Sequence, residues 1–340
     1  MVANESTNTD LPTIAQALQD HESFAICGHV NPDGDCLGSM LALGGALRAM
    51  GKQVDCLLVE DTPVEEGLHF IPGFDGLIPA PSYTGSPEVF ITVDVAMDSR
   101  IGVCADFRAA ADLTITVDHH RVKALYSQLS YVDPDAPAAC LIIWDLIKLL
   151  PLDVTPDIAL CAYTGLMTDT GRFQYQNTTA AAYRAAAEMV EAGVEPDLPA
   201  REVFQSRSMA SLALEGRLIE RMQLLYGNRF SFSYITRQDF DEFHATKADA
   251  EPLVDTLRAV RGVQIACILK AQPDNVVRGS LRAKTDADVS IIARRLGGGG
   301  HTAAAGFTFD GTLEAAIDAV KREVGEVFAD LDANTGSEDR

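Results

Sequence analysis

The chain has few features of secreted, membrane-bound or polyanion-binding proteins. Its seven cysteines, among 340 residues, include no CxxC pair, which argues against a disulfide framework and against thiolate metal sites. No apolar run approaches the about 20 residues that span a bilayer, and the first ten residues lack the pattern of a signal peptide. Positive charge is scarce, because 27 lysines and arginines are outnumbered by 49 aspartates and glutamates. The net charge of −22 disfavours long duplex DNA and anionic membranes as partners. We therefore expect a cytoplasmic protein with reduced thiols.

The apolar residues, 47% of the chain, suffice for two domains with separate cores. In the first half, strand-like segments alternate with helix-like ones, such as the segment 36–50. Unbroken apolar runs at 23–28, 88–94 and 112–118 are typical of strands that are buried on both faces. This pattern predicts an α/β fold with a parallel sheet, in which ligands gather at the carboxyl ends of the strands.

A second, smaller α/β domain is expected after a helical stretch. The segment from Gly193 to Pro199 contains one glycine and two prolines, which indicates a boundary, and 201–224 is predicted to form a long connecting helix. Further strands are expected at 230–236, 263–269 and 276–282. The predicted division is a first domain over 1–195, a helical linker over 196–224, a second domain over 225–332 and a disordered tail over 333–340.

Ligand-type side chains cluster where the predicted strands end. His29, Asp33 and Asp35 occupy a loop between the first strand and its helix, and Asp94 ends a later strand. One imidazole among carboxylates suits manganese, magnesium or iron better than structural zinc, which favours sulfur. The alternative is that Asp35 and Asp94 merely cap helices.

The triplet Asp118-His119-His120 closes another predicted strand. Because adjacent side chains of an extended backbone point to opposite sides, the two histidines should have different roles, one toward a metal and one toward a substrate. The alternative is one buried and one exposed histidine without function. Asp169 adds a carboxylate at a predicted helix end, where a solvated charge pair with Arg172 is the alternative. Such residues at four element ends together favour a metal site.

The second domain carries a glycine-rich, basic segment. Gly297 to Gly300 could bring backbone N–H groups close to a phosphate, although the segment is not a P-loop, because no Lys-Ser or Lys-Thr pair follows the glycines. A flexible hinge with a solvated surface is the alternative. The basic side chains nearby are Arg278, Arg282, Lys284, Arg294, Arg295 and His301.

These motifs together resemble the DHH phosphoesterases that carry a DHHA1 domain, and among them the nanoRNase/pAp phosphatases (pAp is 3′-phosphoadenosine-5′-phosphate) and the stand-alone cyclic-di-AMP phosphodiesterases. The resemblance covers residues 20 to 325, with four glycines where three were expected. The matching motifs are His29-x-x-x-Asp33-x-Asp35, Val93-Asp94, Asp118-His119-His120, Thr168-Asp169-Thr170-Gly171-Arg172-Phe173 and Gly297 to His301.

The resemblance implies a homodimeric hydrolase with two divalent ions per chain. Manganese is the first choice for these ions. It implies that one ion is held by His29, Asp33 and Asp94, and the other by Asp35, Asp94, His119 and Asp169. The catalytic residues would be Asp94, His120 and Arg100, and the residues that bind substrate would be Arg100, Arg282, Gly298, Gly299, Gly300 and His301.

Short nucleotides are the expected substrates: pAp, 5′-phosphorylated di- and oligonucleotides, and cyclic-di-AMP as a further candidate. Two alternatives stay open, an inorganic pyrophosphatase with the same first-domain motifs and a non-catalytic nucleotide sensor.

Overall fold

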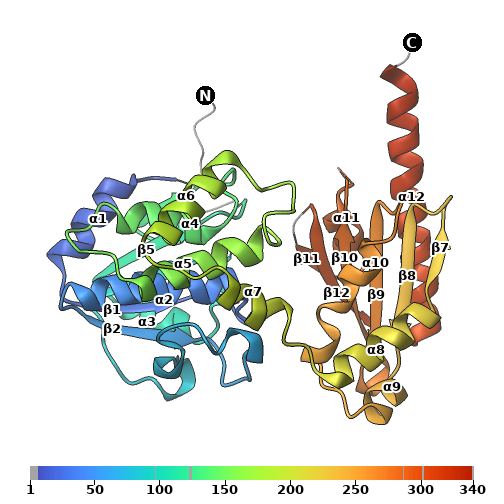
Figure 1. Ribbon diagram of the computed structural model, residues 1–340, viewed down its shortest axis with the longest axis horizontal. Coiled ribbons are helices and arrows are strands. Elements are labelled where there is room, and N and C mark those ends of the chain that lie inside the picture. Colours follow the sequence, from blue (N-terminus) through green and yellow to red (C-terminus); the bar gives the residue numbers. More distant parts are fainter. Residues whose placement is uncertain (1–6, 96, 122–124, 286, 301, 339–340) are drawn as a thin grey trace. The chain divides into compact units, whose positions relative to one another are not determined.

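The computed structural model describes residues 7–95, 97–121, 125–285, 287–300 and 302–338. The chain divides into two compact units, a first unit Met1–Ser206 and a second unit Arg207–Arg340 (Figure 1). Each unit has its own sheet and its own cores. The prediction of two α/β domains is confirmed. The boundary between the units falls within the segment that was expected to link the domains.

The first unit contains a six-stranded sheet in which every pair of neighbouring strands is parallel. This confirms the parallel sheet that the apolar runs predicted. In spatial order the strands are β3 (Ile78–Pro79), β2 (Gln53–Leu58), β1 (Ser23–Cys27), β4 (Val89–Val93), β5 (Leu113–Asp118) and β6 (Leu129–Val132).

Both faces of this sheet are covered, as the alternation of side chains along β1 requires. Phe24 and Ile26 lie in the larger core, and Ala25 and Cys27 lie in a smaller core that includes Cys104 of α3 (Cys104–Ala110). The helices that contribute to the larger core are α1 (Leu11–Asp20), α2 (Gly34–Ala49), α4 (Ala139–Ile147), α5 (Pro156–Asp169) and α6 (Ala180–Glu191); α7 (Asp197–Phe204) ends the first unit.

Helices α2 and α5 approach each other closely through glycines. A Cβ atom on Gly38 would lie 2.5 Å from the Cys161 carbonyl oxygen, and one on Gly34 would lie 2.4 Å from the Thr168 hydroxyl oxygen. On α5, a Cβ atom on Gly165 would lie 3.0 Å from Cα of Asp35. These three glycines therefore let the start of α2 pack directly on the end of α5.

The second unit has a mixed sheet, in which β8 and β9 are parallel and the other pairs are antiparallel. Its strands in spatial order are β11 (Gly299–Gly300), β12 (Ala304–Asp310), β10 (Val276–Ala283), β9 (Ile265–Ala271), β8 (Phe230–Ile235) and β7 (Gln223–Leu225). Helices α11 (Val289–Arg295) and α12 (Leu313–Glu338) pack into one core, and α8 (Met209–Glu220), α9 (Arg237–Glu242) and α10 (Leu253–Arg258) pack into another. Short 3₁₀ turns complete the chain: Glu66–Leu68, Phe74–Gly76, Ala80–Ser82, Asp98–Arg100, Ala248–Ala250 and Pro273–Asn275.

Three sequence predictions about the second half differ from the structure. The single helix expected at 201–224 is wrong, because the chain breaks after α7 and restarts at α8, where the Ser208 hydroxyl accepts a hydrogen bond from the Ser211 amide. Helix α8 buries Leu214 and Leu218 in the second unit, so it is part of that unit and not a free linker. Most of the expected tail is helical, since α12 continues to Glu338. Strand β12 was not predicted, because two alanines and a glycine, which have low strand propensity, occupy its first three positions.

None of the helices in the described part of the chain is long and apolar enough to cross a membrane.

Candidate active site

The candidate site lies at the carboxyl ends of β1, β4 and β5, which are neighbours in the first sheet. His29 follows β1, Asp94 follows β4, and His119 and His120 follow β5. Asp35 enters from the start of α2, and Asp169 is the last residue of α5 (Figure 1). The parallel topology and the close α2–α5 packing thus bring together residues that are far apart in sequence.

Asp94 is the centre of the group. Its Oδ2 lies 3.3 Å from Nε2 of His29, and its Oδ1 lies 3.4 Å from Nε2 of His119 and 3.4 Å from Nδ1 of His120. The residue is buried, and its backbone φ of 55° lies in the left-handed region, which aspartate and asparagine tolerate better than most residues. The chain therefore accepts an uncommon backbone conformation where it places this carboxylate.

The remaining predicted ligands surround this centre. Nε2 of His119 lies 3.8 Å from Oδ2 of Asp35 and 3.8 Å from Oδ2 of Asp169. Asp33, whose side chain is 62% exposed, lies 3.9 Å from Nε2 of His29. The structure thus gathers all six predicted metal ligands in one place.

Hydrogen bonds outside the group orient the ligand atoms. Nδ1 of His29 lies 2.9 Å from the Val30 carbonyl and Nδ1 of His119 lies 3.2 Å from the Ala136 carbonyl, so that both Nε2 atoms face the carboxylates. The Asp35 carboxylate accepts hydrogen bonds from the Ala139 and Cys140 amides at the start of α4. The donors of a helix start hold this buried carboxylate in position.

The alternative that Asp35 and Asp94 merely cap helices is wrong for both residues. The residue that caps α2 is Asp33, whose Oδ1 accepts from the Asp35 and Cys36 amides. Asp94 caps no helix, since the 3₁₀ turn that follows begins only at Asp98. The same Oδ1 of Asp33 that caps the helix is the oxygen that lies 3.9 Å from Nε2 of His29.

The expectation that His119 and His120 point to opposite sides is wrong. Both rings approach Oδ1 of Asp94, and their centroids are 4.8 Å apart. The strand ends at Asp118, whose Oδ1 accepts hydrogen bonds from both histidine amides, and the side-chain alternation of the strand ends with it.

Two residues of the site were not predicted from the sequence. Asp118 is fully buried, and its Oδ1 lies 2.8 Å from Nδ1 of His120, so that it orients this ring. The thiol of Cys36 belongs to a second group with His29 and Asp94, in which all ligand atoms lie within 4.8 Å of one another. Cys36 directly follows Asp35, and this adjacency was the one signal available.

Arg100 is also placed at the site. Its Nη2 lies 3.2 Å from Nδ1 of His29 and 3.5 Å from the Val30 carbonyl oxygen. Its backbone carbonyl accepts a hydrogen bond from the Val30 amide, which ties its loop to the loop of His29. The guanidinium is half-buried and can approach an anion bound nearby.

The predicted substrate residues of the second unit form a separate group. Arg282 lies on β10, and Gly299 and Gly300 form β11. A Cβ atom on Gly298 would meet the Gly306 carbonyl oxygen at 2.0 Å, whereas one on Gly299 would meet nothing within 4 Å. Gly298 is thus required for packing and Gly299 offers an open backbone. His301 lies outside the described residues.

The buried carboxylates interact unfavourably with one another. The pKa of Asp35 is raised to about 6 by burial and by the charge of Asp94. Burial and the charge of Asp35 also raise the pKa of Asp169 well above its usual range. For Asp94, burial has the same tendency, but contacts with His119 and His29 outweigh it and lower the pKa.

The carboxylates in turn raise the pKa of two histidines, His29 and His119. Burial tends to lower the pKa of His29, but the contact with Asp94 and the charge of Asp33 raise it to about 9. His119 behaves alike, and Asp94 and Asp169 raise its pKa to about 11 against the effect of burial. In the metal-free protein, protons on these imidazoles therefore balance part of the carboxylate charge.

These residues fit divalent cations. Oδ1 of Asp94 is buried and accepts no well-directed hydrogen bond within the described part of the chain, although imidazole nitrogens lie 3.4 Å away. Three groups of metal-type ligands meet at or beside this residue. Carboxylate oxygens and imidazole nitrogens are the ligands that manganese and magnesium accept, and a cation would replace the protons on the histidines.

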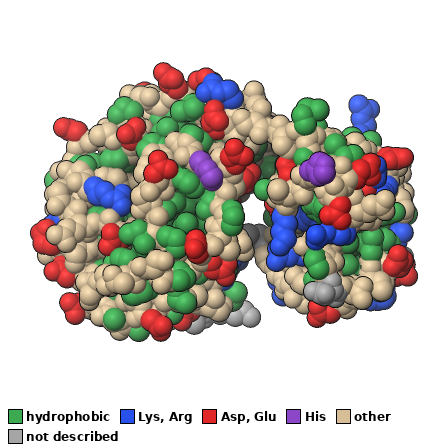
Figure 2. All heavy atoms as spheres, turned by 90° about the horizontal axis from the view of Figure 1, so that it is seen from below, with side chains coloured by type: hydrophobic (Ala, Val, Ile, Leu, Met, Phe, Trp, Pro, Cys, Tyr) green, Lys and Arg blue, Asp and Glu red, His purple; other side chains and the backbone are tan. Residues whose placement is uncertain are grey.

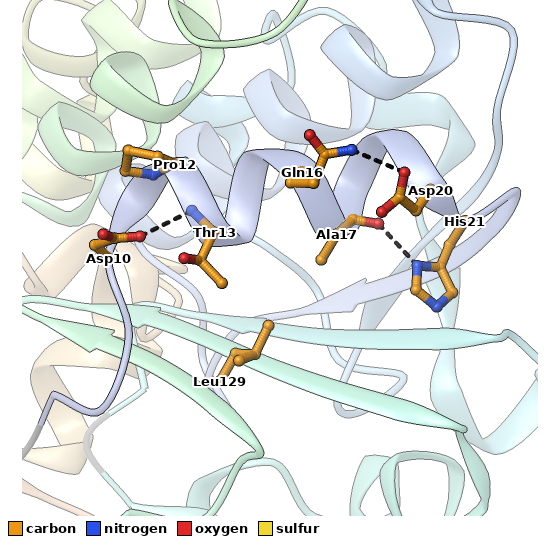
Figure 3. A pocket seen from close by; sticks show the side chains of 8 residues that line it. All are labelled: Asp10, Pro12, Thr13, Gln16, Ala17, Asp20, His21 and Leu129. Carbon is orange, nitrogen blue, oxygen red and sulfur yellow. Dashed lines mark hydrogen bonds between the residues drawn. The ribbon is translucent and has the colours of Figure 1, made fainter.

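One hollow of the first unit lies apart from this site. It measures about 500 Å³ and lies beside α1 near Leu129, the first residue of β6, and thus toward the amino end of that strand (Figure 3). Its polar side chains bond within the helix region: Asp10 accepts from the Thr13 amide, and Gln16 donates to Asp20. Nothing there points to a ligand.

Comparison with known families agrees with the fold. The model of the DHH family, N-terminal domain, matches residues 23–166, and that of the DHHA1 domain matches residues 228–328. The chain therefore belongs to the DHH family and carries both domains in this order. Members of this family are phosphoesterases, and the chain is an enzyme of that class.

Individual relatives extend the likeness over nearly the whole chain. The bifunctional oligoribonuclease and PAP phosphatase NrnA of Thermus thermophilus is 31% identical, with 92% of this chain and 93% of that protein covered. The cyclic-di-AMP phosphodiesterase PdeA of Listeria monocytogenes is 24% identical over 85% of this chain and 45% of its own length. Among solved structures, an exopolyphosphatase-related protein from Bacteroides fragilis superposes with a TM-score of 0.87 at 25% identity, with 93% of this chain and 95% of that one covered.

Proposed function

We propose that the chain hydrolyses short nucleotide phosphoesters with the help of two divalent ions, in the first place Mn²⁺. The substrates would be pAp, which gives AMP, and 5′-phosphorylated di- and oligonucleotides, with cyclic-di-AMP as a further candidate. The observation that supports this most is the buried group around Asp94, in which one carboxylate lies between two sets of metal-type ligands. The similarity to NrnA proteins supports the choice of substrates.

The residues divide into two ligand sets that share Asp94. One ion would be held by His29, Asp33 and Asp94, and the other by Asp35, Asp94, His119 and Asp169. Two such ions supply a water that is deprotonated at neutral pH and can attack phosphorus.

Two further side chains would act on the substrate itself. The Asp118 carboxylate fixes the ring of His120 through Nδ1, so that Nε2 can exchange a proton with the phosphate or the leaving oxygen. Arg100 would bind a phosphate oxygen, because its guanidinium is held at the edge of the ligand group by the loop of His29. In the second unit, Arg282 and the open backbone at Gly299 would hold a second part of the nucleotide.

We also propose that the enzyme is cytoplasmic and homodimeric. Seven free, buried cysteines fit the reducing cytoplasm, and the family resemblance supports a homodimer. Sedimentation equilibrium of the full chain tests the second point, and a monomer at micromolar concentration would contradict it.

The decisive experiment is a substrate panel with Mn²⁺: pAp, 5′-phosphorylated diadenylate, cyclic-di-AMP, pyrophosphate and a long single strand. We expect fast release of AMP from pAp and from the dinucleotide and slow cleavage of the long strand. Turnover of pyrophosphate alone would contradict the choice of substrates. If nothing is cleaved although two ions bind per chain, the enzymatic proposal is wrong and a sensor is favoured.

A further inference from the structure

One face of the second sheet is covered only in part. Side chains of β8 and β9 such as Ile235, Ala266 and Ile268 are buried there beneath α8 and α10. The face continues onto β10 and β12, where Arg278, Gly306 and Thr308 are exposed. A strip of sheet beside this core is thus open to solvent.

The open strip presents a row of polar side chains along β10. Arg278, Ser280 and Arg282 alternate with Val277 and Leu281, which are buried in the core on the opposite face. Across the strands, Ser280 pairs with Ile268 and Arg282 pairs with Ala266, both of which belong to the core on the same face as the row. These three residues, called the β10 row below, therefore share the open face.

The arginines of the β10 row differ from most cations of this chain. Among the described residues, neither Arg278 nor Arg282 lies within ion-pair distance of a carboxylate, whereas neighbouring Lys270 pairs with Glu251 at 2.8 Å. The second unit also holds most of the positive charge, with 17 of the 27 lysines and arginines. Figure 2 shows such side chains gathered on one part of this unit, while acidic ones are scattered over the first unit.

The spacing of the row fits a polyanion with regular repeats. Same-face residues of a strand are about 6.8 Å apart, so Arg278 and Arg282 are separated by about 13.5 Å, or two such steps. Each step is comparable to one backbone repeat of an extended single strand, and a charged groove with this period can follow its phosphates. On β12, Gly306 pairs with Ser280. Because Gly306 has no side chain, there is room for the sugar-phosphate backbone of a nucleic acid beside the middle of the row.

We propose that the β10 row binds successive phosphates of a single-stranded oligonucleotide, with Arg282 and Arg278 two phosphates apart. This inference rests on the proposed function and deepens it: the enzyme would hold a tetranucleotide by one charged contact more than it holds shorter strands. Arg278 would contribute only when the strand has a fourth nucleotide, because one phosphate lies at the metal site and the next two lie at Arg282 and Ser280, whereas Arg282 would contribute to every substrate.

The test compares Arg278→Gln with Arg261→Gln in the full chain with Mn²⁺. Arg261 is exposed, has no ion pair among the described residues and lies off the sheet, so its variant is a control for lost charge. The substrates are 5′-phosphorylated di-, tri- and tetraadenylates. We expect Arg278→Gln to raise KM for the tetranucleotide by about tenfold, the loss of one charged hydrogen bond, and to leave the trinucleotide, the dinucleotide and pAp within twofold. Arg261→Gln should change none of them by more than twofold.

Binding gives a second readout that does not need turnover. The affinity of a phosphorothioate-linked tetraadenylate should fall in Arg278→Gln, and the slope of log K against log salt should decrease by about 0.7, the value for one phosphate contact in a single strand. In Gly306→Val, a side chain would fill the space beside Ser280 and weaken the trinucleotide more than the dinucleotide.

The outcomes separate the two proposals. If the wild-type chain cleaves the dinucleotide and Arg278→Gln binds and cleaves the tetranucleotide like wild type, the proposed role of the β10 row is wrong and the proposed function stands. If the wild-type chain cleaves no nucleotide but binds the tetranucleotide more tightly than Arg278→Gln does, the proposed function fails and the role of the row is supported.

Discussion

At the scale of single residues, Asp94 is the side chain on which the site depends most. It contacts three imidazoles, and its own backbone has a φ of 55°. An alanine at this position would be strained as well as lacking the carboxylate, whereas asparagine tolerates this backbone and keeps one oxygen.

We therefore expect Asp94→Asn to remain folded and to lose at least about a thousandfold in kcat with Mn²⁺, because both proposed ligand sets would lose the carboxylate that they share. Turnover of pAp, circular dichroism and metal content per chain measure this. A variant that keeps two ions and nearly full activity would remove Asp94 from the site.

Asp118 should act through His120 and not on metal. Since its Oδ1 orients the His120 ring, Asp118→Asn is expected to lower kcat by roughly 10- to 100-fold while KM and the number of bound ions stay near wild type. The kcat-against-KM comparison together with metal analysis checks this. Loss of an ion in the variant would instead make Asp118 part of the metal site.

At the scale of elements, the contact between α2 and α5 positions Asp35 near Asp169. A Cβ atom at Gly38 would lie 2.5 Å from a backbone carbonyl oxygen of α5, which cannot move as a side chain can. On α8, Gly216 is a matched control, because a Cβ atom there meets nothing within 4 Å.

Gly38→Ala should therefore destabilise the first unit by about 1–3 kcal/mol, the usual cost of overpacking. Gly216→Ala should stabilise the second unit by about 0.5–1 kcal/mol, because alanine favours a helix more than glycine does. Urea unfolding followed by circular dichroism measures both free energies of unfolding. Equal effects of the two substitutions would show that the α2–α5 contact adjusts easily.

The elements also show where sequence reasoning succeeded. The apolar runs that became β1, β4 and β5 identified the parallel sheet and the edge at which the site lies, since a strand buried on both faces has few alternatives. Strand β12, with alanines and a glycine, had no such pattern and was missed. The break between α7 and α8 was also missed, because a solvent-exposed turn needs only a capping serine such as Ser208.

At the scale of the whole molecule, charge divides unevenly. The first unit has 29 acidic and 10 basic residues, and the second has 20 acidic and 17 basic ones. The excess of negative charge thus lies with the candidate metal site, and the near-balanced unit carries the β10 row. Metal ions should accordingly stabilise the first unit alone.

We expect calorimetry of the full chain to show one unfolding transition that rises with Mn²⁺ and one that does not. An ion at 100 times its Kd adds about 2.7 kcal/mol to the stability of the unit that binds it. Chelation with EDTA should reverse the shift, and Asp94→Asn should reduce it. Equal shifts of both transitions would place metal binding elsewhere.

The sequence by itself determined the fold class, the two domains and the six candidate metal ligands, because buried strands and strand-end loops leave strong local patterns. Only the tertiary structure decided that Asp118 orients His120, that Asp33 and not Asp35 caps α2, and that both histidines face Asp94. It also decided that Arg278 lies with Arg282 on an open face. Such facts depend on which elements pack together and on how the backbone turns after a strand, and distant parts of the chain set both.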